Sequence, residues 1–181
     1  MDGKDFFNLY THGFVRLAAA VPEVKVADPA FNARTTIALM GEAAERKAVI
    51  AVFPELGLSA YSCEDLFHQQ ALLDASLNAL SEVSSASCGL PIITVVGLPL
   101  KVDDMLFNCA AVICRGRILG IVPKTYLPNY REYYELRQFT PADRALRQTI
   151  DLPGQREVPF GARRNSFQTK TPQSAAIIVA P

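Results

Sequence analysis

The feature that most constrains the fold is an apolar run, AVIAVFPE, which spans residues 48–55 and ends in Pro54 and a carboxylate. The run is too short for an ordinary helix, and it is rich in Val and Ile, which pack well in sheets. Its apolar residues are consecutive rather than alternating, so both faces of the strand need cover. The run therefore predicts a central strand of a layered α/β domain.

The neighbouring segments repeat a strand–helix–strand order, because runs of apolar residues alternate with segments of helical periodicity. We predict strands over 13–21 and 89–100, and helices over 28–47 and 65–87. Residues 105–124 predict two strands joined by a turn at Gly116. Residues 128–139, which begin with Pro128, predict a short amphipathic helix or a turn. This order favours an α/β domain with a mixed sheet.

Composition excludes several classes of function. Half of the 181 residues are hydrophobic and the formal net charge is zero, so charge gives no argument for a nucleic-acid partner. The sequence contains no run of about 18 uncharged apolar residues, so a membrane span is not expected. The acidic, polar N-terminus does not resemble a signal peptide. We therefore expect a cytosolic protein with reduced thiols.

A metal site is not expected, because the cysteines form no C-x-x-C pair and His12 and His68 lie far apart. Cys109 and Cys114 lie in apolar stretches and are interpreted as small core residues.

Two charged residues stand at the ends of predicted strands. Glu55 closes the 48–55 run, and Lys124 follows the second strand of the predicted hairpin. Strand ends are where α/β proteins place working groups, because the strand fixes the position and the following loop stays open. A lysine there could stabilise negative charge on an oxygen. Solvated surface charges at both positions are an equally acceptable reading.

A third charged residue, Glu132, lies among tyrosines at 126, 130, 133 and 134. Such an aromatic cluster can line a small pocket and raise the pKa of a buried carboxylate. The alternative is a surface glutamate beside tyrosines that only pack.

Several stretches together are more specific than these patterns. They are YTHGFVRLAAA, FPELGLSAYS, VVGLPL and LFNCAAVICRGRILGIVPKTYLPNYREYYE. They strongly resemble the nitrilase (carbon-nitrogen hydrolase) superfamily, and more narrowly the N-terminal glutaminase domain of glutamine-dependent NAD synthetases. The resemblance runs from about residue 10 to about residue 161.

The resemblance implies a nitrilase-like αββα sandwich, of which this chain would form the first part. It implies that Glu55 is the general base, that Lys124 stabilises the tetrahedral oxyanion, and that Glu132 orients the lysine and the substrate. The tyrosines that match the glutamine pocket of the family are Tyr61, Tyr130 and Tyr133.

In the family, a cysteine thiolate attacks the side-chain amide of glutamine and releases ammonia, and water hydrolyses the thioester. The ammonia then reaches an ATP-dependent synthetase domain that amidates deamido-NAD. The resemblance therefore implies no cofactor for these residues, with ATP and Mg²⁺ needed only in the synthetase domain, and a homo-oligomer for the full-length proteins.

The sequence departs from the family in its nucleophile. The family's thiol follows the lysine by some tens of residues in a motif like E-[IV]-C-E-D, but no cysteine follows Cys114 here. The resemblance stops near Gly161, so we divide the chain into a partial glutaminase domain, 1–161, and a divergent tail, 162–181. We expect an inactive product of a truncated or frame-shifted reading frame.

Cys63 imitates the nucleophile, since SCEDLF resembles the family motif. It precedes Lys124, however, which is the wrong chain order, so we expect a packing or helix-start role. Two alternatives stay open: a stand-alone amidase that uses Cys63 or another thiol, and a non-catalytic nitrilase-like assembly protein.

Overall fold

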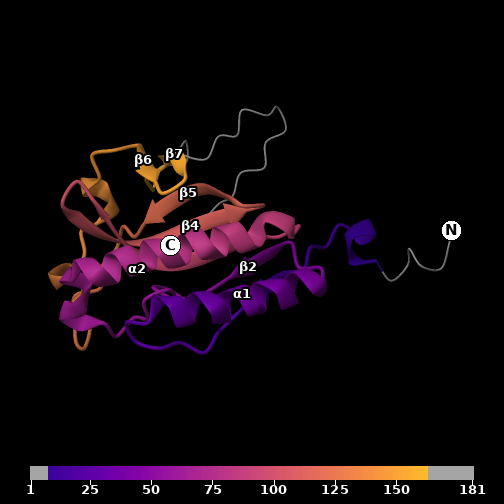
Figure 1. Cartoon of the computed structure of the whole chain (residues 1–181), viewed down its shortest axis with the longest axis horizontal. Coiled ribbons are helices and arrows are strands. Elements are labelled where there is room, and N and C mark those ends of the chain that lie inside the picture. The colour runs from indigo at the N-terminus through magenta and orange to yellow at the C-terminus, as the bar shows by residue number, and fades with distance from the viewer. Residues whose placement is uncertain (1–7, 163–181) are drawn as a thin grey trace.

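A five-stranded mixed sheet organises residues 8–162, which are the residues that the computed structural model describes (Figure 1). The first three strands pair in parallel and the last three pair antiparallel. In spatial order the strands are β1 (Leu17–Ala19), β2 (Ile50–Val52), β3 (Ile93–Val102), β4 (Met105–Cys114) and β5 (Arg117–Pro123). The predicted mixed α/β sheet is confirmed, with β2 inside it.

Two long helices, α1 (Pro29–Glu45) and α2 (Gln70–Ala86), pack side by side against one face of the sheet (Figure 1). The Asp28 side chain caps α1 by accepting a hydrogen bond from the Phe31 amide, as expected of an Asp before Pro at a helix start. The core between the helices and the sheet includes Met40, Val83 and Val96, all essentially inaccessible to water.

The opposite face of the sheet is partly open within the described residues. Leu17 of β1 and Val52 of β2 are 62% and 47% exposed. Ala51, the neighbour of Val52 in β2, points to the other face of the sheet and is fully buried under the helices. Residues 8–162 thus supply one helical layer and one sheet layer of the predicted αββα arrangement. Of the predicted tail, 162–181, residues 163–181 lie outside the described residues, and the division of the chain at residue 161 stays a prediction.

The predicted hairpin over 105–124 is confirmed. Arg115 and Gly116 both have positive φ, as a tight two-residue turn requires. A further two-stranded sheet, β6 (Thr149–Leu152) and β7 (Gln155–Pro159), was not predicted and lies beside β5 (Figure 1).

Two predicted helical segments are shorter than expected. The helix predicted to begin at residue 65 begins at Gln70, since Glu64–His68 form a separate 3₁₀ turn. The 128–139 segment is irregular apart from a 3₁₀ turn at Glu135–Arg137. The other short 3₁₀ turns are Leu9–His12, Ser87–Gly89 and Ala142–Arg144. No described helix is long and apolar enough to cross a membrane.

Gly97 of β3 lets the loop after β2 lie directly on the sheet. A Cβ at this position would lie 2.7 Å from the Pro54 carbonyl oxygen and clash with the Leu56 amide nitrogen. The Gly97 carbonyl in turn accepts a hydrogen bond from the Leu58 amide at 3.0 Å. The absence of a side chain at Gly97 therefore sets how closely the loop that carries Glu55 packs on β3.

We predict that Gly97→Ala lowers the free energy of unfolding by about 1–3 kcal/mol, because the added methyl group meets backbone that must shift. Urea denaturation measures the change. The matched control is Gly41→Ala in α1, where nothing lies within 4 Å of the new Cβ and where stabilisation of up to about 1 kcal/mol is expected. Equal stabilities of the two variants would contradict the packing described here.

Candidate active site

Glu55 stands at the carboxyl end of β2, at the predicted strand end. The chain leaves the strand through Phe53, whose amide bonds the Val95 carbonyl, and turns at Leu56, which has a φ of +52°. A left-handed backbone at a non-glycine residue is uncommon and is held here by the contact with Gly97. The turn leaves the Glu55 side chain 43% exposed.

Lys124 follows β5 directly and reaches Glu55. Its backbone amide bonds the Asn108 carbonyl on neighbouring β4 at 2.8 Å, which continues the sheet pairing by one residue. Its Nζ lies 2.7 Å from Glu55 Oε1. The fold thus brings together two charged residues that are 69 positions apart.

A second carboxylate, Glu135, holds the same ammonium group. Lys124 Nζ lies 3.0 Å from its Oε1 and 2.9 Å from its Oε2, and the Glu135 side chain is only 5% exposed. The Tyr61 hydroxyl donates a further hydrogen bond to Glu135 Oε1 at 2.7 Å. A buried carboxylate needs such partners, because burying an unpaired charge is costly.

Asn108 completes the cluster from β4. Its Nδ2 donates to the same Glu55 oxygen that Lys124 contacts, and the residue is buried. The amide fixes the Glu55 carboxylate while leaving its other oxygen free of these two contacts. We define the lysine cluster as Glu55, Asn108, Lys124, Glu135 and Tyr61.

The surroundings within the cluster raise the pKa of two of its members, Lys124 and Tyr61. Burial by itself would lower the pKa of Lys124, but the hydrogen bonds and negative charges of Glu55 and Glu135 outweigh burial and raise it. Burial, together with the Glu135 carboxylate, raises the pKa of the Tyr61 hydroxyl. Lys124 therefore stays charged, and Tyr61 stays a neutral hydrogen-bond donor, at neutral pH.

The contact expected of Glu132 belongs to Glu135 instead. Glu132 is exposed and has no hydrogen bond or ion pair to Lys124 within residues 8–162. The reason is local: the 3₁₀ turn at Glu135–Arg137 begins with Glu135, whose amide bonds the Pro128 carbonyl and which points inward. Both glutamates belong to the quoted YREYYE, so the sequence did place an acid in this segment. Because the backbone there is irregular, the sequence has no periodicity from which to infer which of the two side chains points inward.

The three predicted tyrosines are placed differently. Tyr61 belongs to the lysine cluster, and Tyr133 lines a recess beside it together with Tyr61 and Glu135. Tyr130 is 64% exposed and packs its ring against that of Tyr133, with centroids 6.1 Å apart. Asn108 was not predicted, although it lies inside the quoted LFNCA.

Cys63 is a packing residue in this structure. It is 1% exposed and belongs to a small hydrophobic cluster with Leu56, Phe67 and Phe139. Its thiol donates to the Ser59 carbonyl, with Sγ and O 3.0 Å apart. Burial raises the pKa of the thiol, which disfavours the reactive thiolate.

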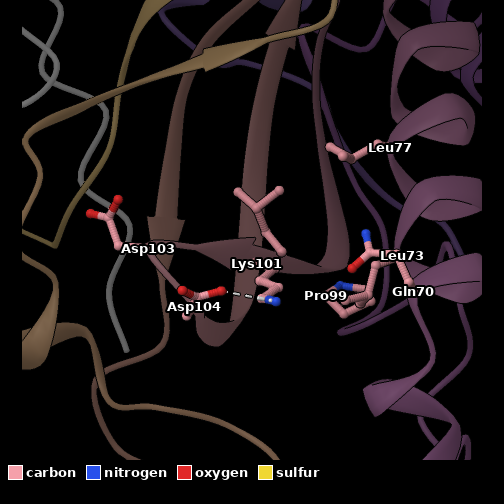
Figure 2. A pocket seen from close by; sticks show the side chains of 8 residues that line it. Gln70, Leu73, Leu77, Pro99, Lys101, Asp103 and Asp104 are labelled. Carbon is pink, nitrogen blue, oxygen red and sulfur yellow. Dashed lines mark ion pairs between the residues drawn. The ribbon is translucent and has the colours of Figure 1, made fainter.

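A larger recess, of about 360 Å³, lies away from these residues, between the start of α2 and the β3–β4 hairpin (Figure 2). Its charged residues include Lys101 and Asp104, whose side chains form an ion pair at 3.1 Å. Asp103, on the same hairpin, pairs with Arg147. This recess contains no predicted site residue. Among the described residues, no group of three or more His, Cys, Asp or Glu side chains is placed to hold a metal ion.

Comparison with known proteins identifies the family. The sequence pattern described as carbon-nitrogen hydrolase matches residues 16–169. The chain belongs to the carbon-nitrogen hydrolase family. The resemblance drawn from FPELGLSAYS and the other stretches is thereby confirmed.

Individual members of this family show a narrower similarity. A glutamine-dependent NAD(+) synthetase of Mycobacterium tuberculosis is 45% identical over 157 residues, which cover 87% of this chain and 23% of that protein. The crystal structure of a glutamine-dependent NAD(+) synthetase from Cytophaga hutchinsonii superposes with a TM-score of 0.74 at 26% identity, over 81% of this chain and 25% of that one. The chain thus spans about a quarter of the length of these relatives.

An amidase from Nesterenkonia sp. shares the fold, with a TM-score of 0.58 at 21% identity, over 70% of this chain and 48% of that one. The carbon-nitrogen hydrolase fold is therefore common to this chain and to proteins of quite different length.

Thiol labelling should separate the cysteines by burial. We expect iodoacetamide to modify exposed Cys88 much faster than Cys63 or Cys109, which are buried in the native protein, because modification then requires local opening. Mass spectrometry after timed quenching gives each rate, and labelling in urea is the control in which the rates converge. A native rate for Cys63 equal to that of Cys88 would contradict a packing role.

The raised pKa of Lys124 predicts a pH dependence of stability. A lysine whose folded pKa is raised stabilises the fold below its unfolded pKa of about 10.4, and this contribution is lost as the pH rises through the folded pKa. At pH 8 we expect Lys124→Met to cost about 3 kcal/mol, since it leaves a buried carboxylate unpaired.

Urea denaturation from pH 8 to pH 11 measures this dependence, and the gap between the parent protein and Lys124→Met should narrow above about pH 10.4. Lys101→Met is the matched control, because its partner Asp104 is 96% exposed and surface pairs contribute at most about 1 kcal/mol. A pH-independent gap for Lys124→Met would show that its charge is not what stabilises the fold.

Proposed function

We propose that the lysine cluster is the base and oxyanion-binding part of an amide-hydrolysing site, and that its substrate is the side-chain amide of glutamine. The observation that carries this proposal is the Lys124 ammonium group held between two carboxylates of unequal exposure, Glu55 and Glu135. Glu55 is exposed enough to contact a substrate and Glu135 is buried, so the first suits acid–base chemistry and the second suits holding the lysine in place.

Glu55 suits the role of general base. It is half exposed, and only one of its oxygens is engaged by Lys124 and Asn108. In thiol-dependent amide hydrolysis, the base takes the proton from S–H as sulfur bonds the amide carbon. The protonated base then gives that proton to the departing nitrogen as the C–N bond breaks, which releases ammonia and leaves a thioester. The same carboxylate then deprotonates the water that hydrolyses the thioester.

Lys124 suits the role of oxyanion donor. When sulfur adds to the carbonyl, negative charge develops on oxygen, and a fixed ammonium group nearby stabilises that charge more than it stabilises the starting amide. Glu135 and Tyr61 act through Lys124: the buried carboxylate fixes the ammonium, and the Tyr61 hydroxyl fixes the carboxylate. We therefore assign Glu135, rather than Glu132, the orienting role.

The nucleophilic thiol is not supplied by Cys63, which is buried in the hydrophobic cluster. No cysteine follows Lys124 in the sequence, so we propose that this chain binds the amide but does not hydrolyse it unaided. The similarity to glutamine-dependent NAD(+) synthetases supports glutamine as the substrate.

The same similarity supports a wider proposal. The ammonia would serve the amidation of deamido-NAD, with ATP and Mg²⁺ bound by a synthetase part and none needed by the lysine cluster. We also propose a cytosolic location and, for the full-length relatives, homo-oligomers.

Binding of L-glutamine tests the substrate. Titration followed by ¹⁵N–¹H NMR should shift amide signals of the loops at residues 55–61 and 124–135. We expect Lys124→Ala to weaken this binding at least about tenfold, because hydrogen bonds to charged groups contribute about 1.5–3 kcal/mol. Lys101→Ala is the matched control. Unchanged binding by Lys124→Ala would overturn the proposal.

Release of ammonia from glutamine tests the missing thiol. We expect the purified chain to release no more ammonia than a blank, in a coupled glutamate dehydrogenase assay. Activity that Cys63→Ser abolishes would instead support a stand-alone amidase that uses Cys63.

A further inference from the structure

The SCEDLF stretch, residues 62–67, contributes no member to the lysine cluster, but it lies against the segment that carries Glu135. We call residues 134–139 the Glu135 segment. Phe67 packs its ring against that of Phe139, with centroids 5.0 Å apart. Within residues 8–162, no backbone hydrogen bond joins the two stretches. Side chains alone therefore set how they lie against each other.

The polar contacts between the two stretches come from the two acids of SCEDLF. The Asp65 carboxylate accepts two hydrogen bonds from Arg137 Nη2, at 2.8 and 2.9 Å, and one from Gln138 Nε2 at 3.4 Å. Glu64 accepts a hydrogen bond from the Tyr134 hydroxyl. Its φ of +51° is uncommon for a non-glycine residue and persists only where the surroundings fix the backbone. Asp65 is the central contact, because it bonds two residues of the Glu135 segment.

The backbone around Glu135 needs such support. The Glu135 amide bonds the Pro128 carbonyl, and the Phe139 amide bonds the Glu135 carbonyl, so both bonds stay within one irregular stretch. The Thr140 amide then bonds the Leu106 carbonyl on β4 at 2.7 Å, which anchors only the end of the segment. The Glu135 carboxylate thus depends on side chains from outside its own stretch for its position.

The Asp65–Arg137 pair is too exposed to contribute much to global stability. The two side chains are 69% and 62% exposed, and exposed ion pairs contribute little to the free energy of unfolding. Asp103 and Arg147 form a second carboxylate–guanidinium pair, at 2.7 Å. Within the described residues, neither of these two bonds a member of the lysine cluster. The molecule therefore contains one ion pair beside the Glu135 turn and a comparable pair elsewhere.

We propose that Asp65 and Arg137 are positioning residues of the amide-hydrolysing site. Through this pair, SCEDLF holds the turn at Glu135–Arg137, and the turn keeps the Glu135 carboxylate against the Lys124 ammonium group. The inference rests on the proposed function and deepens it, because it gives the stretch that imitates the nucleophile motif a part in orienting the oxyanion donor. Both residues act through Glu135.

The pKa of Lys124 tests the positioning, because burial lowers it and the hydrogen bonds of Glu55 and Glu135 raise it. The ¹³Cε signal of Lys124, assigned by its loss in Lys124→Met, gives this pKa in a titration upward from pH 8. We expect both Asp65→Asn and Arg137→Met to lower the pKa towards its ordinary value of about 10.4, since Glu135 is then held less firmly.

Direct charge effects would give a different pattern. Removal of a negative charge lowers the pKa of a nearby lysine, whereas removal of a positive charge raises it. A fall in both Asp65→Asn and Arg137→Met therefore reports lost positioning. Opposite shifts in the two variants, or no shift in either, would overturn the proposal.

A double variant and two controls complete the test. Asp65→Asn combined with Arg137→Met should lower the pKa of Lys124 no further than either change alone, because both remove the same contact. Asp103→Asn and Arg147→Met should leave this pKa unchanged. The urea midpoints of all four single variants should stay close to that of the parent. Additive effects in the double variant, or an equal fall in the controls, would contradict the positioning role.

Binding of L-glutamine separates this inference from the proposed function. We expect Asp65→Asn and Arg137→Met each to weaken binding about threefold to tenfold, and Asp103→Asn to leave it unchanged. If the parent binds glutamine while neither variant changes the pKa of Lys124, the positioning role is overturned and the proposed function stands. If the parent binds no glutamine while both variants lower that pKa, the proposed function is overturned and the pair still positions Glu135.

Discussion

The ammonium group of Lys124, shared between Glu55 and Glu135, is the interaction on which the site depends. Two carboxylates this close would repel each other, and one of them is buried, so the cation between them makes the arrangement tolerable. The unequal exposure of the two acids then follows from the backbone. Glu55 stands on an open strand end, whereas Glu135 is drawn inward by the turn that it begins. Electrostatics and topology thus place the two acids in different environments, one exposed and one buried.

The precision of this arrangement comes from neighbours that carry no charge. Gly97 allows the Glu55 loop to lie on β3, and Asn108 on β4 bonds both Glu55 and the backbone of Lys124. Each neighbour lies on a strand between β2 and β5, the strands that carry the two charges. The sheet therefore acts as a rigid spacer, which is how catalytic groups are generally held in a productive geometry.

The strands that carry Glu55 and Lys124 could be predicted from the residues alone, and the predictions that differ from the structure do so for physical reasons. The apolar run before Glu55 and the hairpin before Lys124 are strong signals, because strand cores need continuous apolar sequence. Glu132 was chosen over Glu135 because an irregular loop has no period from which to infer which side chain points inward. The hairpin β6–β7 was missed although Pro153-Gly154 marks its turn, since its short strands bury few residues. The burial of Cys63 depends on distant Phe139, which no local pattern reveals.

The separation of Glu55 and Lys124 by 69 residues also bears on the order in which the molecule folds. Closing so long a loop is slow, and surface ion pairs are too weak to drive it. The β3–β4–β5 meander, with its short connections, can pair early and place Lys124 before Glu55 arrives. The charges that define the site are therefore expected to meet late, on a sheet already assembled by apolar contacts. Selection for chemistry can then alter them without disturbing the nucleus of the fold.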